Sequence, residues 1–216
     1  MATKGRPNLT NKQDPRDGVL DMGPARGKNS DLLSLAQYYE EQNFNPVDCG
    51  PLSVEFMDDY ERLRRKIFEY NLQIPVRLFK EASVLEFGPA SGENSLVLAR
   101  WGARLHLVEP VQSFAEILKR RFSQFGFSES LGSLTCTTLE SFRSNSLFDF
   151  VIAEGFIHQV GDPEFWVPQL VSFTAIDGFI IFSYPESSGF LIELLQANCA
   201  QVLARTNFGN IHSASH

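Results

Sequence analysis

The sequence predicts an α/β fold, a doubly wound and mostly parallel sheet that follows an N-terminal helical cap. From about residue 80 onward, short apolar runs alternate with stretches of helical periodicity, which is typical of strand–helix units in a parallel sheet. The first of these runs, 83–87, leads through a glycine-containing loop into a helical pattern at 93–101. With 216 residues and 43% hydrophobic residues, the chain can form one such domain with its own core.

Two zones precede the sheet. Residues 1–30 are rich in Gly, Pro, Asn, Lys and Asp and lack an apolar periodicity, so they cannot bury enough surface to offset chain entropy, and we expect a disordered tail. Residues 31–80 carry helical patterns and form the expected cap. Its second helix, at about 54–70, is predicted from apolar residues at helical spacing, namely Phe56, Tyr60, Leu63, Ile67 and Phe68. The sheet domain then covers residues 81–216.

The elements of the sheet domain follow in order along the chain. Each expected strand is a short apolar run, and each expected helix is a periodic stretch between two such runs. The strands fall near 83–87, 104–109, 133–137, 149–153 and 178–184, the last of them entered through the turn Asp177-Gly178. The helices fall near 93–101, 111–124, 162–175 and 187–205.

The loop after the first strand combines two glycines with two acids. Gly88 lets the backbone turn off the strand, and Gly92 lets the start of the helix approach both a ligand and the sheet. Glu86 lies two residues before the first glycine, and Glu109 ends the next apolar run, a spacing that suits a carboxylate bound to two ribose hydroxyls. The G-x-G-x-x-G spacing expected for a pyrophosphate is absent. The acid before the loop instead suits a ligand with an amine and a positive centre.

Four segments occur in a recognisable order. The loop at 86–92 reads acid-x-Gly-x-Ala-x-Gly, and Glu109 ends the second strand. An apolar strand and its following loop occupy 148–160, and a glycine turn leads into another apolar strand at 177–185. In this order they resemble the class I S-adenosylmethionine-dependent methyltransferases, whose first motif reads acid-x-Gly-x-Gly-x-Gly; Ala90 stands in place of the middle glycine. The resemblance implies a Rossmann-like fold with S-adenosylmethionine as cofactor.

The resemblance also implies a set of cofactor-binding residues. It places Glu109 at the family's ribose-binding acid and assigns the loop after the third strand to the adenine edge, where Thr138 stands in place of a frequent aspartate. Phe156 either lies near the methyl-donor channel or packs in the core. The expected cofactor-binding residues are Glu86, Gly88, Pro89, Gly92, Glu109, Pro110, Thr138, Leu139, Glu154, Gly155 and Phe156.

Two candidate catalytic residues, Glu154 and His158, follow the fourth strand, where ligands meet a doubly wound sheet. In-line methyl transfer mainly needs positioning, and it needs a base only when the acceptor is a hydroxyl or a charged amine. The pKa of histidine, about 6.5 when unperturbed, suits proton removal; the alternative for His158 is an ordinary loop histidine. Glu154 acts as a base, orients the methionine end of the cofactor or caps a turn.

The helical cap resembles the lids that close over the pocket in small-molecule methyltransferases. By that resemblance, the residues facing the acceptor are Tyr38, Tyr39, Phe44 and Tyr60. The alternative is that they merely cover one face of the sheet. The His-Gln-Val-Gly-Asp-Pro run at 158–163 is closer to the small-molecule branch than to the N-P-P-Y type. We therefore expect a small-molecule acceptor, such as a sugar or polysaccharide precursor.

The strand pattern ends earlier than the resemblance implies. The sheet of this family continues through a sixth strand, a helix and an antiparallel seventh strand, and no pattern after Arg205 predicts them. We therefore expect either a fragment of a longer protein or a shortened member of the family. In both cases the fifth strand would present an unpaired edge, through which a homo-oligomer can form.

Net charge, cysteine spacing and the length of the apolar stretches limit which partners we expect. The formal net charge of −7 disfavours nucleic acid as a partner, and the basic runs at 62–66 and 119–121 are expected to be solvated helix faces. The three cysteines lack metal-ligand spacing, so we expect no metal, and we expect Cys136 to be a small core residue. No apolar stretch reaches spanning length and no signal-type segment begins the chain, so we expect a cytoplasmic protein without a membrane partner.

Three hypotheses follow for the function. The first is an S-adenosylmethionine-dependent methyltransferase that acts on a small molecule. The second is a nicotinamide-dependent oxidoreductase, which Glu86 and the missing G-x-G-x-x-G oppose. The third is a catalytically inactive binding module that has kept the fold, which the short sheet and Thr138 favour.

Overall fold

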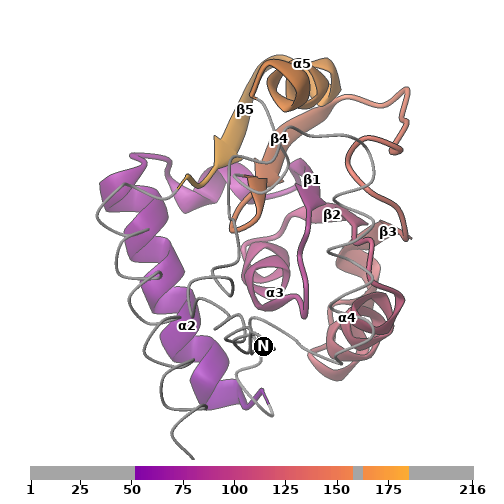
Figure 1. The fold of residues 1–216 in the computed structure, drawn as a ribbon. Coiled ribbons are helices and arrows are strands. Elements are labelled where there is room, and N and C mark those ends of the chain that lie inside the picture. Colours follow the sequence, from indigo (N-terminus) through magenta and orange to yellow (C-terminus); the bar gives the residue numbers. More distant parts are fainter. Residues whose placement is uncertain (1–51, 158–162, 185–216) are drawn as a thin grey trace, which may run out of the picture.

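The computed structural model describes residues 52–157 and 163–184, and a five-stranded sheet lies at their centre (Figure 1). All strand pairs are parallel, in the order β3-β2-β1-β4-β5. The order reverses between β1 and β4, so the predicted doubly wound, Rossmann-like sheet is confirmed, with its switch point between these two strands. The strands are β1 Ser83–Phe87, β2 Arg104–Val108, β3 Leu131–Thr135, β4 Phe148–Ala153 and β5 Thr174–Phe182.

Helices cover both faces of this sheet. Neighbouring residues of a strand point to opposite faces, and accordingly Val84 packs with one apolar cluster and Leu85 with another. The first cluster includes residues of three helices, α2, α3 and α4, and the second includes residues of α5. The helices are α2 Val54–Lys66, α3 Glu93–Arg100, α4 Gln112–Gln124 and α5 Pro163–Phe173, with a π-helical turn at Ile67–Asn71 and 3₁₀ turns at Val76–Phe79 and Ser128–Ser130. The helix predicted at 187–205 lies outside the described residues.

Helix α2 belongs to the expected cap, and it is fastened to α3. Ser53 caps the start of α2 by accepting a backbone N–H of the first turn at 3.0 Å. Polar contacts then join α2 to α3 and its C-cap, among them Asp58 with Arg100 at 2.7 Å, Tyr60 with Asn94 at 2.6 Å, and Glu61 with Trp101 at 2.7 Å. This part of the cap therefore packs directly on the helix that follows the glycine loop.

The buried face of α2 differs from the apolar stripe that the sequence predicts. Leu63 is 53% exposed, whereas Met57, Arg64 and Phe68 are buried. These three residues are seven and four positions apart, so they share one side of the helix. The guanidinium of Arg64 lies 5.1 Å from the ring centre of Phe68, which gives the charge an aromatic face to pack against.

Strand β5 begins earlier and less regularly than the predicted range of 178–184. It starts at Thr174, directly after α5, and its regular pairing with β4 resumes at Phe179. The irregular part contains Asp177, with φ of +63°, and Gly178, so the expected turn lies inside the strand as a bulge. Among the described strands β5 pairs only with β4, and a homo-oligomer through its other edge stays a prediction.

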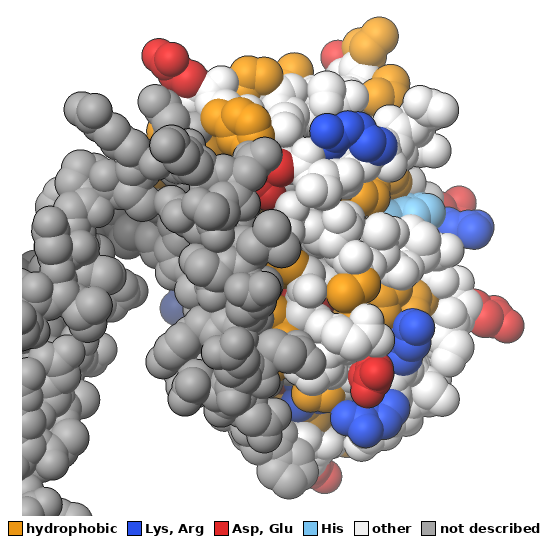
Figure 2. Space-filling view, turned by 45° about the vertical axis from the view of Figure 1, so that its right-hand side comes forward, with side chains coloured by type: hydrophobic (Ala, Val, Ile, Leu, Met, Phe, Trp, Pro, Cys, Tyr) orange, Lys and Arg blue, Asp and Glu red, His pale blue; other side chains and the backbone are white. Residues whose placement is uncertain are grey.

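Charges on the described surface are mixed. Figure 2 shows basic and acidic side chains interspersed on one face of the molecule, without a continuous basic field. None of the helices within 52–157 and 163–184 is long and apolar enough to cross a membrane.

Candidate functional site

The site lies where β1, β2 and β4 end, beside the switch point of the sheet. Residues 88–92 form the loop from β1 to α3, and the predicted acids Glu86, Glu109 and Glu154 stand at the ends of the three strands. Open α/β sheets bind ligands at this position. The structure thus brings together the main residues that the sequence predicts for the cofactor.

Two glycines of this loop are required by its geometry. Gly88 has φ of +63°, and a Cβ there would lie 2.7 Å from the ring of Phe156. Gly92 has φ of +91°, and a Cβ there would lie 2.3 Å from a methyl carbon of Leu118. Ala90 also adopts a left-handed conformation, with φ of +48°, which glycine adopts without strain. The backbone at Ala90 is therefore of the kind that the family's middle glycine provides.

Glu86 is buried beneath the loop, with 3% of its surface exposed. The hydroxyl of Ser95, in the first turn of α3, donates a hydrogen bond to Oε2 of Glu86 at 2.6 Å. Burial raises the pKa of Glu86 to about 7. The bond from Ser95 opposes this rise, the charges of Glu154 and Glu109 add to it, and the charge of Arg64 lowers the pKa.

Glu109 fastens the glycine loop to the start of α4. One carboxylate oxygen accepts the backbone N–H of Ala90 and the other accepts that of Val111, each at 2.9 Å. The side chain is buried, so these bonds satisfy backbone groups that lie away from water. Glu109 therefore shapes the loop in addition to its predicted role at the ribose.

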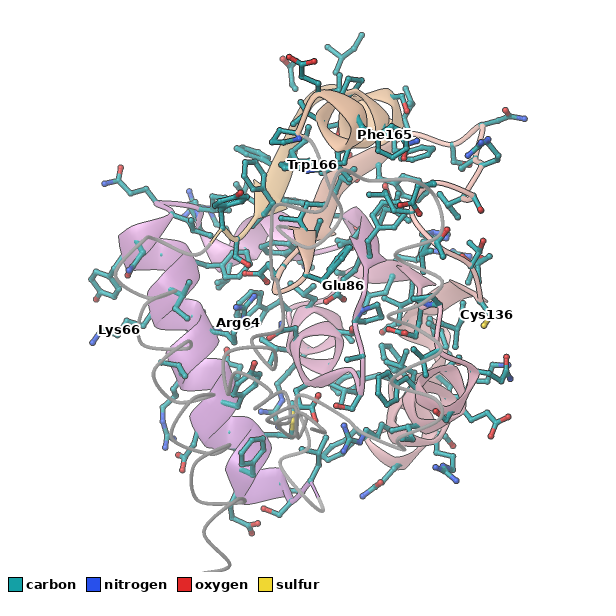
Figure 3. All side chains as sticks on the ribbon, viewed as in Figure 1. Arg64, Lys66, Glu86, Cys136, Phe165 and Trp166 are labelled. Atoms are coloured by element: carbon teal, nitrogen blue, oxygen red, sulfur yellow. The ribbon has the colours of Figure 1, made fainter. Side chains whose placement is uncertain are left out.

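Glu154 meets an arginine that the sequence interpretation missed. Nη1 and Nη2 of Arg64 donate to Oε1 and Oε2 of Glu154 at 3.3 and 2.5 Å. The exposed fractions of the two side chains are 9% and 18%. Figure 3 shows Arg64 on the side of α2 that faces the sheet, whereas Lys66 points away from it. The interpretation of 62–66 as a solvated face is therefore wrong for Arg64, because the carboxylate directly after β4 is its partner.

A half-buried arginine, Arg121 of α4, supports the loop from below. Nη1 of Arg121 donates to the carbonyl oxygen of Ser91 at 2.7 Å and to Oε1 of Glu93 at 2.6 Å. The Ser91 hydroxyl donates to the other oxygen of Glu93 at 2.7 Å. The prediction of a solvated face at 119–121 is thus wrong for Arg121, since its guanidinium binds the loop carbonyl of Ser91 and the carboxylate of Glu93.

Residues 155–157, which follow β4, lie at one side of the site. The ring of Phe156 lies against Gly88, and the N–H of Gly155 donates to the hydroxyl of Ser183 at 2.7 Å. Ile157 is buried in the second apolar cluster. The contact places Phe156 beside the glycine loop, and its position near the methyl-donor channel stays a prediction.

The loop after β3 contributes mostly backbone and apolar groups. Leu139 is buried in the second apolar cluster, and the carbonyl oxygen of Thr138 accepts two backbone N–H groups of the following turn. The Cys136 thiol donates to the carbonyl oxygen of Pro110 at 3.5 Å. Cys136 is exposed, so its prediction as a core residue is wrong; the short β3 ends before it.

Some of the remaining predicted residues lie within the described part of the chain, and others lie outside it. Pro89 is buried, and its carbonyl oxygen accepts the N–H of Gly92 at 2.9 Å. Tyr60 is half-buried and bonds Asn94 at the start of α3, next to the glycine loop. Four predicted residues lie outside the described ranges: Tyr38, Tyr39, Phe44 and His158.

The charges at this edge fit a positively charged ligand. In the described part of the chain, the charges of Glu154 and Glu109 raise the pKa of Glu86, and the charge of Arg64 lowers it. An amine or a sulfonium would offset the excess of negative charge. Within the same ranges, no group of three or more His, Cys, Asp or Glu side chains could hold a metal ion.

A family model described as "Methyltransferase domain" matches residues 58–216, which is most of the chain. A comparison with curated proteins found no match.

Solved structures with the same fold are methyltransferases. A crystal structure of magnesium protoporphyrin IX methyltransferase from Synechocystis PCC 6803 with bound S-adenosylmethionine is 16% identical, with a TM-score of 0.54, and the match covers 73% of this chain and 77% of that chain. The same protein with bound S-adenosylhomocysteine is 15% identical, with a TM-score of 0.57, and the match covers 78% and 79%. At these identities the likeness shows the fold. Against a methyltransferase from Thiobacillus denitrificans, 19% identical with a TM-score of 0.48, the match covers 68% of this chain and 54% of that one.

Proposed function

Because this chain belongs to the class I S-adenosylmethionine-dependent methyltransferases, we propose that it moves a methyl group from S-adenosylmethionine to a small-molecule acceptor. The observation that carries the proposal is the set of buried or half-buried carboxylates at the ends of β1, β2 and β4, next to a loop that requires two glycines. This set matches the cofactor of the family in charge, because S-adenosylmethionine carries an ammonium and a sulfonium.

We name as the crevice the ends of β1, β2 and β4 together with loop 88–92, and we assign a different part of the cofactor to each of its residues. We assign the ribose hydroxyls to Glu109, because this acid follows β2 beside the glycine loop and bonds the N–H of Ala90 in that loop. We assign the methionine end to Glu86 and Glu154, and the space over the loop to Gly88 and Phe156. When bound, S-adenosylmethionine supplies a methyl group whose transfer to an acceptor lone pair breaks the carbon–sulfur bond and leaves neutral S-adenosylhomocysteine.

The acceptor side is assigned to the cap and to the loop after β4. A hydroxyl or charged amine acceptor must lose a proton, and we propose His158 as the base that takes it. Both oxygens of Glu154 are engaged by Arg64, which supports an orienting role for Glu154 rather than proton transfer. Tyr60 lies on the cap beside the loop, and we propose that it and Tyr38 contact the acceptor, a sugar precursor or another small metabolite.

Calorimetry tests the cofactor directly. The purified chain is titrated with S-adenosylmethionine, with S-adenosylhomocysteine and, as a control, with NAD. We expect micromolar binding of the first two and none of NAD. Binding of NAD alone would favour the oxidoreductase hypothesis, and a folded chain that binds none of the three would overturn the proposal.

Methyl transfer is then measured with a panel of acceptors. Isotope-labelled S-adenosylmethionine is supplied with sugar nucleotides, small phenols and amines, and a magnesium porphyrin, because the structurally similar enzyme from Synechocystis acts on such a compound. Labelled product from one class identifies the acceptor. Cofactor binding without transfer to any class would favour a binding module over an enzyme.

A further inference from the structure

We propose that Ser95 is a positioning residue for cofactor binding, whose hydroxyl holds the Glu86 carboxylate ionised and aimed at the positively charged end of the ligand. This inference rests on the proposed function of the crevice. It concerns a residue outside the glycine motif, on the helix that the loop leads into.

The geometry of the contact is that of a strong, charge-assisted bond. Ser95 Oγ lies 2.6 Å from Glu86 Oε2, within the range of about 2.5–2.7 Å typical of a hydroxyl that donates to a carboxylate. Ser95 is completely buried and Glu86 is 3% exposed, so water does not compete for this oxygen. The bond joins α3 to β1 and therefore spans the two sides of the glycine loop. It fixes one oxygen of Glu86 and thereby the direction of the carboxyl group.

The groups around Glu86 decide whether its carboxyl group is ionised, and the bond from Ser95 is one of them. Burial, the Glu154 carboxylate after β4 and the Glu109 carboxylate after β2 all favour the neutral acid. Ser95 on α3 and Arg64 on α2 favour the ionised form, and Arg64 is already engaged with Glu154. Because the resulting pKa of Glu86 is about 7, the carboxyl group is balanced between its two forms at neutral pH. Loss of the hydroxyl would raise that pKa further and leave mostly the neutral acid, which cannot pair with an ammonium.

The pH dependence of ligand binding separates this role from a purely structural one. A hydroxyl that only stabilises the fold would change the free energy of unfolding and leave the pH profile of binding where it was. A hydroxyl that keeps Glu86 ionised moves the profile to higher pH when it is removed. Ionisation of the ligand itself affects both chains equally, so it drops out of the ratio of their affinities at each pH.

The experiment compares S-adenosylhomocysteine binding by the unchanged chain and by Ser95→Ala, using calorimetry from pH 5.5 to 8.5. Because a hydrogen bond to a charged group is stronger than one between neutral groups, we expect affinity to fall by about tenfold or more at pH 7. The loss should shrink toward pH 8.5, where Glu86 ionises without help. Ser83→Ala is the matched control: it removes another serine hydroxyl that donates to a carboxylate, that of Asp149, at the end of β1 away from the glycine loop, and its pH profile should coincide with that of the unchanged chain.

Each outcome decides the inference. If Ser95→Ala does not fold, Ser95→Cys keeps a side chain of similar size with a weak donor and should show the same shift toward higher pH. A profile of either folded variant that coincides with that of the unchanged chain overturns the role of Ser95. Absence of S-adenosylhomocysteine binding to the folded, unchanged chain overturns instead the proposed function on which the inference rests.

Discussion

The pair between Arg64 and Glu154 should be a strong link between the cap and the sheet. We would replace Arg64 with Met, which keeps most of the side-chain length without the charge, and Glu154 with Gln, alone and together. The matched control is the pair of Arg62 and Asp59 on the same helix, replaced by Met and Asn. That pair is 72% and 71% exposed, whereas the Arg64 and Glu154 side chains are 9% and 18% exposed.

The expected magnitude follows from this difference in exposure. Removal of one partner of a buried pair leaves an uncompensated charge away from water and costs about 3–5 kcal/mol. Glu154 keeps some exposure, so we expect the lower end, about 3 kcal/mol for Arg64→Met. The double variant should lose clearly less than the sum of the two single losses, with a coupling energy of about 2 kcal/mol. For the exposed pair, Arg62 and Asp59, the coupling should stay below about 1 kcal/mol and vanish in salt.

Urea unfolding without ligand measures these free energies, and Trp101, which packs on the cap beside Phe68, provides the fluorescence signal. A coupling between Arg64 and Glu154 no larger than that of the exposed pair would refute the reasoning. A loss for Arg64→Met that persists in full in the Glu154→Gln background would also refute it, because the arginine would then act through packing alone.

Three further predictions concern the crevice. The pKa of Glu86 is raised from 4.5 to about 7 in the folded chain, so its contribution to stability is complete below pH 4.5 and is lost as the pH rises through 7. The expected loss is about 3 kcal/mol in the free energy of unfolding. Glu86→Gln should remove this pH dependence, measured by urea unfolding at several pH values. Glu109→Ala should lower S-adenosylhomocysteine affinity at least tenfold and destabilise the chain by about 2–4 kcal/mol, because a buried and a part-buried backbone N–H lose their acceptor. Glu109→Gln should be milder in unfolding, and equal stability of the two variants would contradict this. Gly88→Ala should cost about 1–3 kcal/mol more than Gly155→Ala, since both have positive φ but only the former meets the ring of Phe156; equal melting curves would count against that contact.

The strands were predictable because their signal is local. A parallel strand is buried on both faces and therefore reads as a short apolar run, and the predicted range 83–87 coincides with β1. The acids of the crevice were predictable for the same reason, since each ends such a run. Strand β5 was predicted less well because its start depends on how α5 ends and on a bulge at Asp177, neither of which changes the apolar pattern.

The partners of Arg64 and Arg121 were not predictable from local pattern. A basic run on an amphipathic helix usually faces water, and only a carboxylate from a distant part of the chain changes that for Arg64. A weak signal was present, because Arg64 shares a helix face with Met57 and Phe68. Ser95 gave no signal at all: a serine inside an apolar helix is ordinary, and its bond to Glu86 emerges only when α3 folds back onto β1.

The ion pair across the cap also bears on how such a protein can diversify. Arg64 and Glu154 are 90 positions apart, yet each should destabilise the fold when the other is missing. An exchange of N-terminal segments between relatives, whether by recombination or by design, would therefore transplant a charge whose counterpart stays behind. A hybrid remains viable when the two positions are inherited together, so among relatives that vary their caps, substitutions at these positions should arise in pairs.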